Sequence, residues 1–308
     1  MKYIIKSVII LASLLLSIQG MQAQQDSQYT QYMYNTATVN PAYAGSREVL
    51  SILALYRSQW IGLDGAPEVL NFSGHTPVGE KVGLGLSFTN DRIGPTSETT
   101  AVADFSYTIM LGDATKLSFG VKAGGNFLDV NMNELNQFNV NDPLSFNYTL
   151  SSPVIGAGTY LHTDNWYVGL SVPNFLTSKH YDIDSDLKIS EASEEMHAYL
   201  IAGYVFNLNP NLKFKPAVLT KAVYGSPLAL DLSANFLFHE KLTLGAAYRL
   251  DAAVSGMAGF QVNENIMVGY AYDYETSELS NYNDGSHEIF LRFELGTRVR
   301  GVVNPRFF

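Results

Sequence analysis

The six histidines are the side chains best suited to acid–base catalysis or metal binding. They are His75, His162, His180, His197, His239 and His287. None stands in a HxxxH or HExxH spacing, and neither a GxSxG motif nor a phosphate-binding glycine loop occurs. The absence of cysteine excludes thiol catalysis, disulfides and thiolate metal sites. The sequence therefore predicts no cofactor, no metal site and no enzyme.

Ser286, His287 and Glu288 are the one cluster whose residue types resemble those of a hydrolase such as a lipase. Adjacent residues on a strand point to opposite faces, so Ser286 and His287 are not expected to form a nucleophile–base pair. We interpret the cluster as the start of a strand that follows a turn. A lipase remains a hypothesis, which loss of activity in His287→Ala would support.

Asp182, Asp184 and Asp186 resemble the opening of a calcium loop. Leu187 stands where such a loop has its glycine, and Ser193 stands where it has its last glutamate. We expect a solvated acidic outer loop, with bound calcium or a contact to a partner as the alternatives.

Strict alternation of large apolar and small polar residues indicates β-strands, and any functional site has to be built on these strands. Leu84, Leu86 and Phe88 alternate with Gly85 and Ser87, and the same pattern recurs along the chain. One face is large and apolar, and the other is small and weakly polar. A soluble sandwich would expose many charges on its polar face, yet charged residues make up only 16% of the chain. The pattern favours a transmembrane antiparallel barrel, with apolar residues toward lipid and polar ones inside.

We expect about 14 strands, which is an even number as in bacterial barrels. They are predicted near 48–57, 68–76, 82–90, 98–110, 115–128, 153–162, 165–172, 194–207, 211–222, 227–238, 241–249, 252–261, 265–273 and 285–295. Tight turns follow the even strands, whereas several long loops follow the odd ones. That arrangement predicts termini in the periplasm and long loops outside the cell. Several charges should face the lumen, either as structural pairs or as a selectivity ring: Lys122, Asp231, Arg249, Asp273, Arg292 and Glu294.

The first 23 residues read as a secretory signal peptide, with Lys2 and Lys6 before a short apolar stretch and Ala23 at the exit. The net charge of −10 becomes more negative once this leader is removed, which disfavours nucleic acid as a partner. Residues 24–47 contain Pro41 and do not suit a central strand. We predict a periplasmic or lumen-entering segment there, followed by a barrel and tail over 48–308.

Several motifs carry a family resemblance over nearly the whole mature chain. They are QYTQYMYN at 28–35, VNPAYAG at 39–45, YRSQWIG at 56–62, NDRIG at 90–94, GYAYD at 269–273, GSHEI at 285–289 and NPRFF at 304–308. Together they resemble the PorP/SprF family of type IX secretion outer-membrane proteins. The ending Pro305, Arg306, Phe307 and Phe308 resembles the family's Pro-Arg-Tyr-Phe, with Phe307 in place of tyrosine. We interpret it as a barrel assembly signal, or alternatively as a docking tail for a periplasmic partner.

The resemblance implies a non-enzymatic outer-membrane barrel for the export and surface attachment of type IX cargo, commonly large adhesins linked to gliding. The cargo would be held through its C-terminal signal domain, and other secretion components and outer-membrane lipid would be further partners. Polar and aromatic residues of two long loops, 129–152 and 173–193, suit a wet interface. Trp60 is either a lipid-interface anchor or a cargo contact. The candidate partner-binding residues are Trp60, Phe138, Tyr148, Asp182, Asp184 and Asp186. The alternative function is an outer-membrane transport channel or porin.

Overall fold

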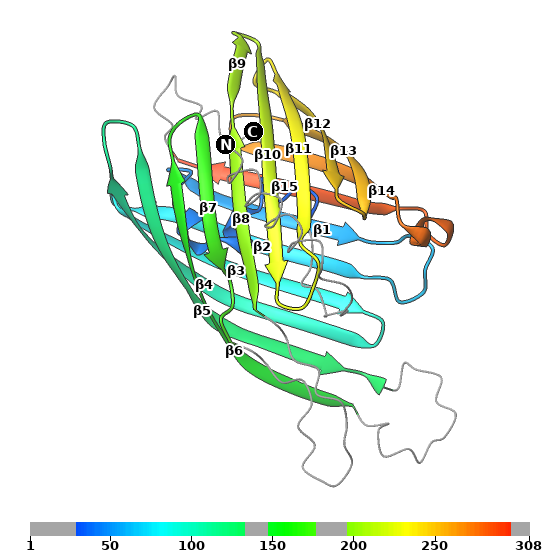
Figure 1. Ribbon diagram of the computed structural model, residues 1–308. Coiled ribbons are helices and arrows are strands. Elements are labelled where there is room, and N and C mark those ends of the chain that lie inside the picture. The colour runs from blue at the N-terminus through cyan, green and yellow to red at the C-terminus, as the bar shows by residue number, and fades with distance from the viewer. Residues whose placement is uncertain (1–28, 133–146, 177–195, 297–308) are drawn as a thin grey trace, which may run out of the picture.

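The computed structural model describes residues 29–132, 147–176 and 196–296, and these fold into one sheet that closes on itself (Figure 1). The strands are β1 (Leu50–Ser58), β2 (Glu68–Val78), β3 (Val82–Ile93), β4 (Thr96–Met110), β5 (Lys116–Val130), β6 (Tyr148–His162), β7 (Trp166–Val172), β8 (His197–Tyr204), β9 (Phe206–Asn209), β10 (Leu212–Val223), β11 (Ala229–Phe238), β12 (Leu242–Arg249), β13 (Ala253–Gln261), β14 (Ile266–Glu275) and β15 (Ser286–Leu295). The helical turns are α2 (Thr36–Val39), η1 (Pro41–Tyr43) and η3 (Glu278–Asn281). None of the helices in these ranges has the length and apolarity needed to cross a bilayer.

The barrel is antiparallel throughout. Its first and last strands pair with each other, with Leu50 of β1 opposite Leu295 of β15, and β10 pairs with β11. β8 and β9 both pair with β10 and are separated only by Val205, so they share one position. The 15 labelled strands therefore occupy 14 positions around the barrel. The predicted all-β barrel of about 14 strands is confirmed.

The connections differ between the two ends of the barrel. We call one the short-turn end, where the connections are residues 79–81, 111–115, 163–165, 210–211, 239–241 and 262–265. We call the other the long-loop end, because it holds the connections over 59–67, 131–147, 173–196 and 276–285. Three connections at the long-loop end are short, namely 94–95, 224–228 and 250–252. β1 runs from the short-turn end to the long-loop end.

The two faces of the strands follow the predicted alternation. On β3, Leu84, Leu86 and Phe88 point outward and are 44%, 69% and 42% exposed. Gly85 and Ser87, between them, are buried on the inner face. Exposed apolar side chains continue around the outside as an apolar belt, for example Phe105, Val121, Ile155, Leu170, Leu232, Leu244, Val254, Tyr270 and Leu291. Such a belt is what a transmembrane barrel turns toward lipid.

The apolar belt makes Leu86→Arg a costly substitution. A cation near the bilayer midplane on the lipid face costs about 2–4 kcal/mol, whereas one near or beyond the interface costs about 0–1 kcal/mol. Thr149→Arg is the matched control, because Thr149 is an exposed outward residue of β6 that lies opposite Asp129, one step beyond the apolar pair position of Phe127. Unfolding titrations in lipid vesicles measure both effects. Equal stability of the two variants would contradict the placement of the belt.

One side of the barrel is taller than the other at the long-loop end. β4, β5 and β6 have 15 residues each, whereas β7 has 7 and β12 has 8. We call the extra height the raised wall, formed by residues 89–93, 96–100, 126–130 and 148–154. Figure 1 shows it reaching well past β7 and β8. Its outward side chains include Asn90, Asp129, Thr149 and Ser151, and Phe127, which is 49% exposed, is the large apolar residue of the belt that reaches furthest along β5.

Candidate functional site

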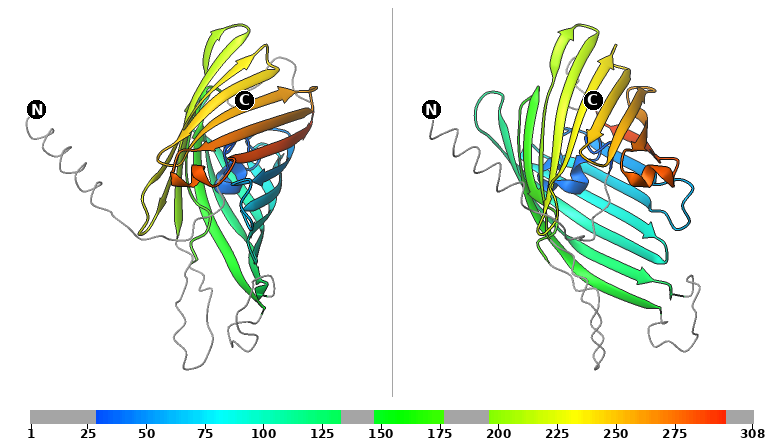
Figure 2. Two further views of the ribbon diagram at one scale, coloured as in Figure 1. Left: turned by 90° about the vertical axis from the view of Figure 1, so that its right-hand side faces the viewer. Right: turned by 45° about the vertical axis from the view of Figure 1, so that its right-hand side comes forward.

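The lumen is filled by the residues that precede β1. We call residues 29–47 the lumen segment, which lies inside the ring of strands (Figure 2). Tyr32, Ala42 and Tyr43 are 4%, 0% and 4% exposed and pack against inward-facing side chains of the strands. The segment begins beside Arg57, near the long-loop end, and reaches the short-turn end just before Leu50 starts β1. It therefore runs through the height of the barrel in the opposite direction to β1.

A cluster of charges fixes the first described residues of this segment. We call Arg57, Asp273, Glu288 and Thr30 the charge clamp. Arg57 Nη2 lies 2.7 Å from Asp273 Oδ2, and Arg57 Nη1 lies 3.5 Å from Glu288 Oε2. Arg57 Nη1 also donates to the Thr30 hydroxyl at 2.8 Å, and that hydroxyl donates to Asp273 Oδ2 at 2.6 Å. Glu288 accepts the backbone N–H groups of Thr30 and Gln31 at 2.9 and 2.8 Å.

Burial makes the charge clamp energetically important. Arg57, Asp273 and Glu288 are 2%, 2% and 1% exposed, and they come from β1, β14 and β15, which are neighbours in the sheet. Buried charges are tolerated when they are paired and their remaining donors and acceptors are satisfied. The two carboxylates are paired with one guanidinium, and the lumen segment donates hydrogen bonds to both of them. The clamp thus joins the segment to the barrel wall.

Further polar contacts hold the middle of the lumen segment. Lys122 Nζ donates to the Thr38 carbonyl at 2.6 Å and lies 3.7 Å from Asp104 Oδ1. Asn40 donates through its side chain to the Thr159 carbonyl at 3.0 Å and caps the turn η1 by accepting the N–H of Ala42. The sequence Asn40-Pro41 suits this turn, because Asn40 caps η1 and Pro41 is its first residue.

Three inward-facing glycines make room for the segment's backbone. A Cβ on Gly83 would lie 2.1 Å from the Ala44 carbonyl oxygen, and one on Gly120 would lie 2.1 Å from the Ala42 nitrogen. A Cβ on Gly158 would lie 2.3 Å from the Asn40 side-chain oxygen. We call these three residues the glycine track. A larger residue at any of them has to displace the segment, since two of the contacts are with backbone atoms.

The predicted lumen charges form pairs on the inner face. Arg249 Nε lies 2.8 Å from Asp231 Oδ1, and Arg292 Nε lies 3.6 Å from Glu294 Oε1. Arg47 of the lumen segment also contacts Glu294, near the short-turn end. Together with Lys122 and Asp273, all six residues named from the sequence are in ion pairs. The expected structural pairing is therefore confirmed for these six residues.

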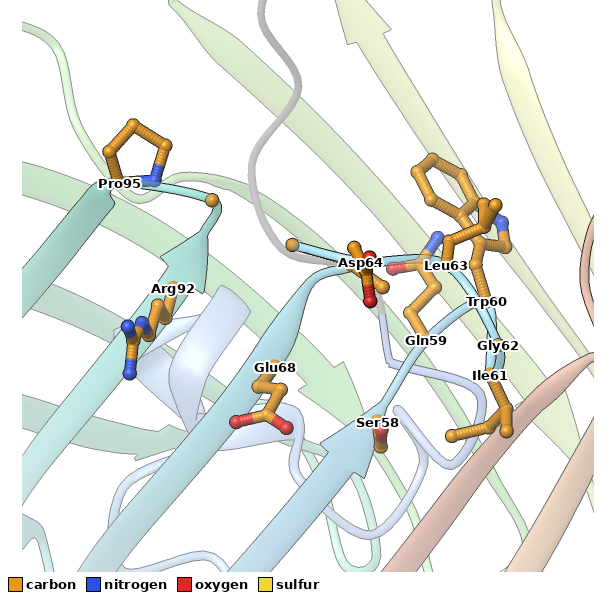
Figure 3. A pocket seen from close by; sticks show the side chains of 13 residues that line it. Ser58, Gln59, Trp60, Ile61, Gly62, Leu63, Asp64, Glu68, Arg92 and Pro95 are labelled. Atoms are coloured by element: carbon orange, nitrogen blue, oxygen red, sulfur yellow. The ribbon is translucent and has the colours of Figure 1, made fainter. Parts of the chain in front are cut away.

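A pocket lies at the long-loop end, beside the raised wall. Its volume is about 730 Å³, and it is lined by residues 58–66 together with Glu68, Arg92, Gly94 and Pro95. Figure 3 shows Trp60 at one side of it and Arg92 with Pro95 at the other. Trp60 donates its backbone N–H to Ser286 Oγ at 3.2 Å and its indole N–H to Glu275 Oε2 at 3.3 Å. These bonds hold the indole at the barrel mouth.

Of the remaining candidate residues, the structure describes Tyr148 alone. Tyr148 is the first residue of β6, on the raised wall, and so belongs to a strand rather than to the predicted loop. Phe138, the acidic trio Asp182, Asp184 and Asp186, and the terminal Pro305, Arg306, Phe307 and Phe308 lie outside the described residues. Their roles stay predictions.

The hydrolase-like cluster does not form a catalytic pair. Ser286 and Glu288 point inward, to Trp60 and to the charge clamp, whereas the His287 ring lies outside beside Tyr270, whose hydroxyl is 2.6 Å from His287 Nδ1. In the described ranges, no three His, Asp or Glu side chains gather as a metal site would require.

The sequence analysis did not predict the charge clamp. Its signal was an arginine and two carboxylates on inward strand positions at the same end of neighbouring strands.

Comparison with known proteins gives a family and a fold. Residues 21–293 match the family model described as type IX secretion system membrane protein PorP/SprF. Among solved structures, the outer membrane protein Omp33 of Acinetobacter baumannii is 9% identical, with a TM-score of 0.50 over 81% of this chain and 100% of that one. The toluene transporter TbuX of Ralstonia pickettii is 12% identical, with a TM-score of 0.49 over 92% and 97%. No curated protein matches the sequence. The likeness to Omp33 shows a shared outer-membrane barrel fold.

Proposed function

Because the chain belongs to the PorP/SprF family of type IX secretion system membrane proteins and is an outer-membrane barrel, we propose that it attaches secreted cargo to the cell surface. The cargo is an adhesin-type protein, and the barrel assists its export and holds its C-terminal signal domain. The role is binding, not catalysis. Other components of the secretion system are its further partners, as family membership implies.

The filled lumen is the observation that carries this proposal. A transport channel or porin needs a continuous aqueous path, and here the lumen segment and the charge clamp occupy the interior. A barrel whose interior is filled with bonded side chains offers surfaces at its ends rather than a passage. Such surfaces suit the binding of a protein cargo.

The proposal places the long-loop end outside the cell and the short-turn end in the periplasm, which is the usual arrangement of bacterial barrels. Residues 1–23 then act as the signal peptide, and Pro305–Phe308 act as the assembly signal in the periplasm. The pocket beside Trp60 lies on the extracellular side, where a cargo domain would meet it. Gliding motility follows if the cargo is a motility adhesin.

Affinity capture tests this function. The tagged barrel is purified from cells that carry either a complete type IX adhesin of the same organism or that adhesin without its C-terminal domain. We expect capture of the complete adhesin and loss of capture of the shortened one. A secreted enzyme from the same cells serves as the control for specificity. Unchanged capture after removal of the domain would overturn the proposal.

A further inference from the structure

The pocket at the long-loop end lies on the outer face of the barrel wall. Ser58, Glu68 and Arg92 are its residues from β1, β2 and β3, and the strand register pairs Ser58 with Glu68 and Glu68 with Arg92 (Figure 3). Their chain neighbours Arg57 and Val69 are buried on the inner face, at 2% and 3% exposure. Successive residues of a strand point to opposite faces, so the three pocket residues form a row that points away from the lumen. The pocket therefore faces the surroundings of the barrel.

The connection over residues 59–66 closes the side of the pocket that lies toward the long-loop end. This loop is tied to the turn between β3 and β4, because the Gly94 N–H donates to the Gly65 carbonyl at 2.9 Å. It is tied on its other side as well, because the Ile61 N–H donates to the Gly285 carbonyl at 2.9 Å. A loop bonded at both sides keeps the pocket formed. The volume of about 730 Å³ falls within the roughly 300–1,000 Å³ of small-molecule sites.

The apolar belt begins directly next to the pocket. One step toward the short-turn end, the outward residues Tyr56 and Leu70 are 42% and 50% exposed. One step further, Phe72 and Phe88 are paired and are 53% and 42% exposed. Phe72 is four residues from Glu68, or about 14 Å along β2. A single molecule can therefore place a polar group in the pocket and an apolar chain on the belt, as a lipid of the surrounding bilayer does.

The charges of the pocket are of both signs. Of the described residues that line it, Arg92 is the one cation, and Asp64 and Glu68 are the two carboxylates. All three side chains are exposed and so can meet a ligand. A guanidinium binds a phosphate through paired hydrogen bonds, and a carboxylate accepts hydrogen bonds from an ammonium group. The excess of one carboxylate disfavours a purely anionic head group and favours one that carries both a phosphate and an ammonium.

We propose that this pocket binds one bilayer lipid whose head group carries a phosphate and a primary ammonium, as in phosphatidylethanolamine. The phosphate would lie against Arg92, the ammonium beside Glu68 and Asp64, and an acyl chain against Phe72 and Phe88. A lipid on the outer side of residues 59–66 leaves the barrel mouth to a cargo domain. The inference rests on the membrane barrel and not on the attachment of cargo.

Native mass spectrometry of the purified full-length barrel tests this site. The barrel is titrated with phosphatidylethanolamine, phosphatidylglycerol and phosphatidylcholine that carry the same acyl chains. We expect one molecule of phosphatidylethanolamine to bind about tenfold more tightly than the other two lipids. Phosphatidylglycerol has no ammonium, and the quaternary ammonium of phosphatidylcholine has no N–H to donate. Glu68→Gln should remove most of this preference, because it deletes a carboxylate and keeps the size of the side chain.

Asp129→Asn is the matched control for Glu68→Gln. Asp129 lies in the same outward row, since Arg92 pairs with Ser97 and Ser97 pairs with Asp129, yet it does not line the pocket. The control should keep the wild-type preference, whereas Arg92→Ala should weaken the binding of all three lipids about tenfold, because each carries the phosphate. Equal binding of the three lipids by the wild-type barrel, or equal effects of Glu68→Gln and Asp129→Asn, would overturn the proposal.

Discussion

Arg57→Ala is expected to destabilise the barrel by about 3–5 kcal/mol, because it leaves two buried carboxylates without their cation. Asp273 and Glu288 are 2% and 1% exposed, and water that enters the cavity left by the guanidinium would not neutralise their charge. The Thr30 hydroxyl also loses a donor. Urea unfolding in vesicles measures the loss of unfolding free energy.

Lys213→Ala is the control for the clamp, because its pair with Glu240 is at the surface, where Glu240 is 53% exposed. Such pairs contribute about 0–1 kcal/mol. We also expect Arg57→Met combined with Asp273→Asn and Glu288→Gln to recover part of the lost stability, since no uncompensated charge is then buried. Similar stabilities for Arg57→Ala and Lys213→Ala would contradict the clamp.

Gly120→Leu is expected to drive the lumen segment out of its place. Its Cβ alone would lie 2.1 Å from the Ala42 nitrogen, and overpacking of this kind costs about 1–3 kcal/mol or more. The chain has no cysteine, so a single Thr36→Cys reporter, at a position 5% exposed, can be followed with a maleimide. We expect slow labelling of the reporter alone and fast labelling when Gly120→Leu is added.

Gly256→Leu is the matched control, because nothing lies within 4 Å of a Cβ at that outward glycine. Planar-bilayer conductance gives a second readout: the wild-type barrel should stay near the baseline, and Gly120→Leu should conduct. Fast labelling of the reporter in the wild-type background, or wild-type conductance like that of an open porin, would favour the channel alternative.

The barrel could be predicted because its membrane-facing strands alternate strongly. Lipid selects large apolar side chains at every second position, as at Leu84, Leu86 and Phe88, so the pattern is visible locally. The predicted strands end at residue 128 and begin again at residue 153, whereas β5 extends to Val130 and β6 begins at Tyr148. Past Phe127 on β5 and Ile155 on β6, the outward residues of each strand are polar, such as Asp129, Thr149 and Ser151, and the alternation of hydropathy disappears although the ladder continues.

The charge clamp and the filled lumen could not be predicted from the sequence, because they depend on contacts between distant parts of the chain. Thr30 and Glu288 are 258 residues apart, and their contact depends on closure of the barrel and on the path of the lumen segment. The spacing of neighbouring residues in the sequence indicates neither the closure of the barrel nor the path of the lumen segment. Pro41 argued against a strand in residues 24–47, yet a periplasmic and a luminal location were equally compatible with it. The glycine track likewise becomes meaningful only when the backbone opposite each glycine is known.

Cargo attachment is tested most directly by titrating the purified full-length barrel with the C-terminal signal domain of a type IX adhesin from the same organism. We predict saturable one-to-one binding with a Kd of about 1 μM or tighter. Binding should weaken when the long-loop end is masked, for example by a bulky label at Trp60→Cys, and stay unchanged when a label is placed at the short-turn end. Absence of saturable binding, or equal binding of an unrelated secreted domain, would contradict the account.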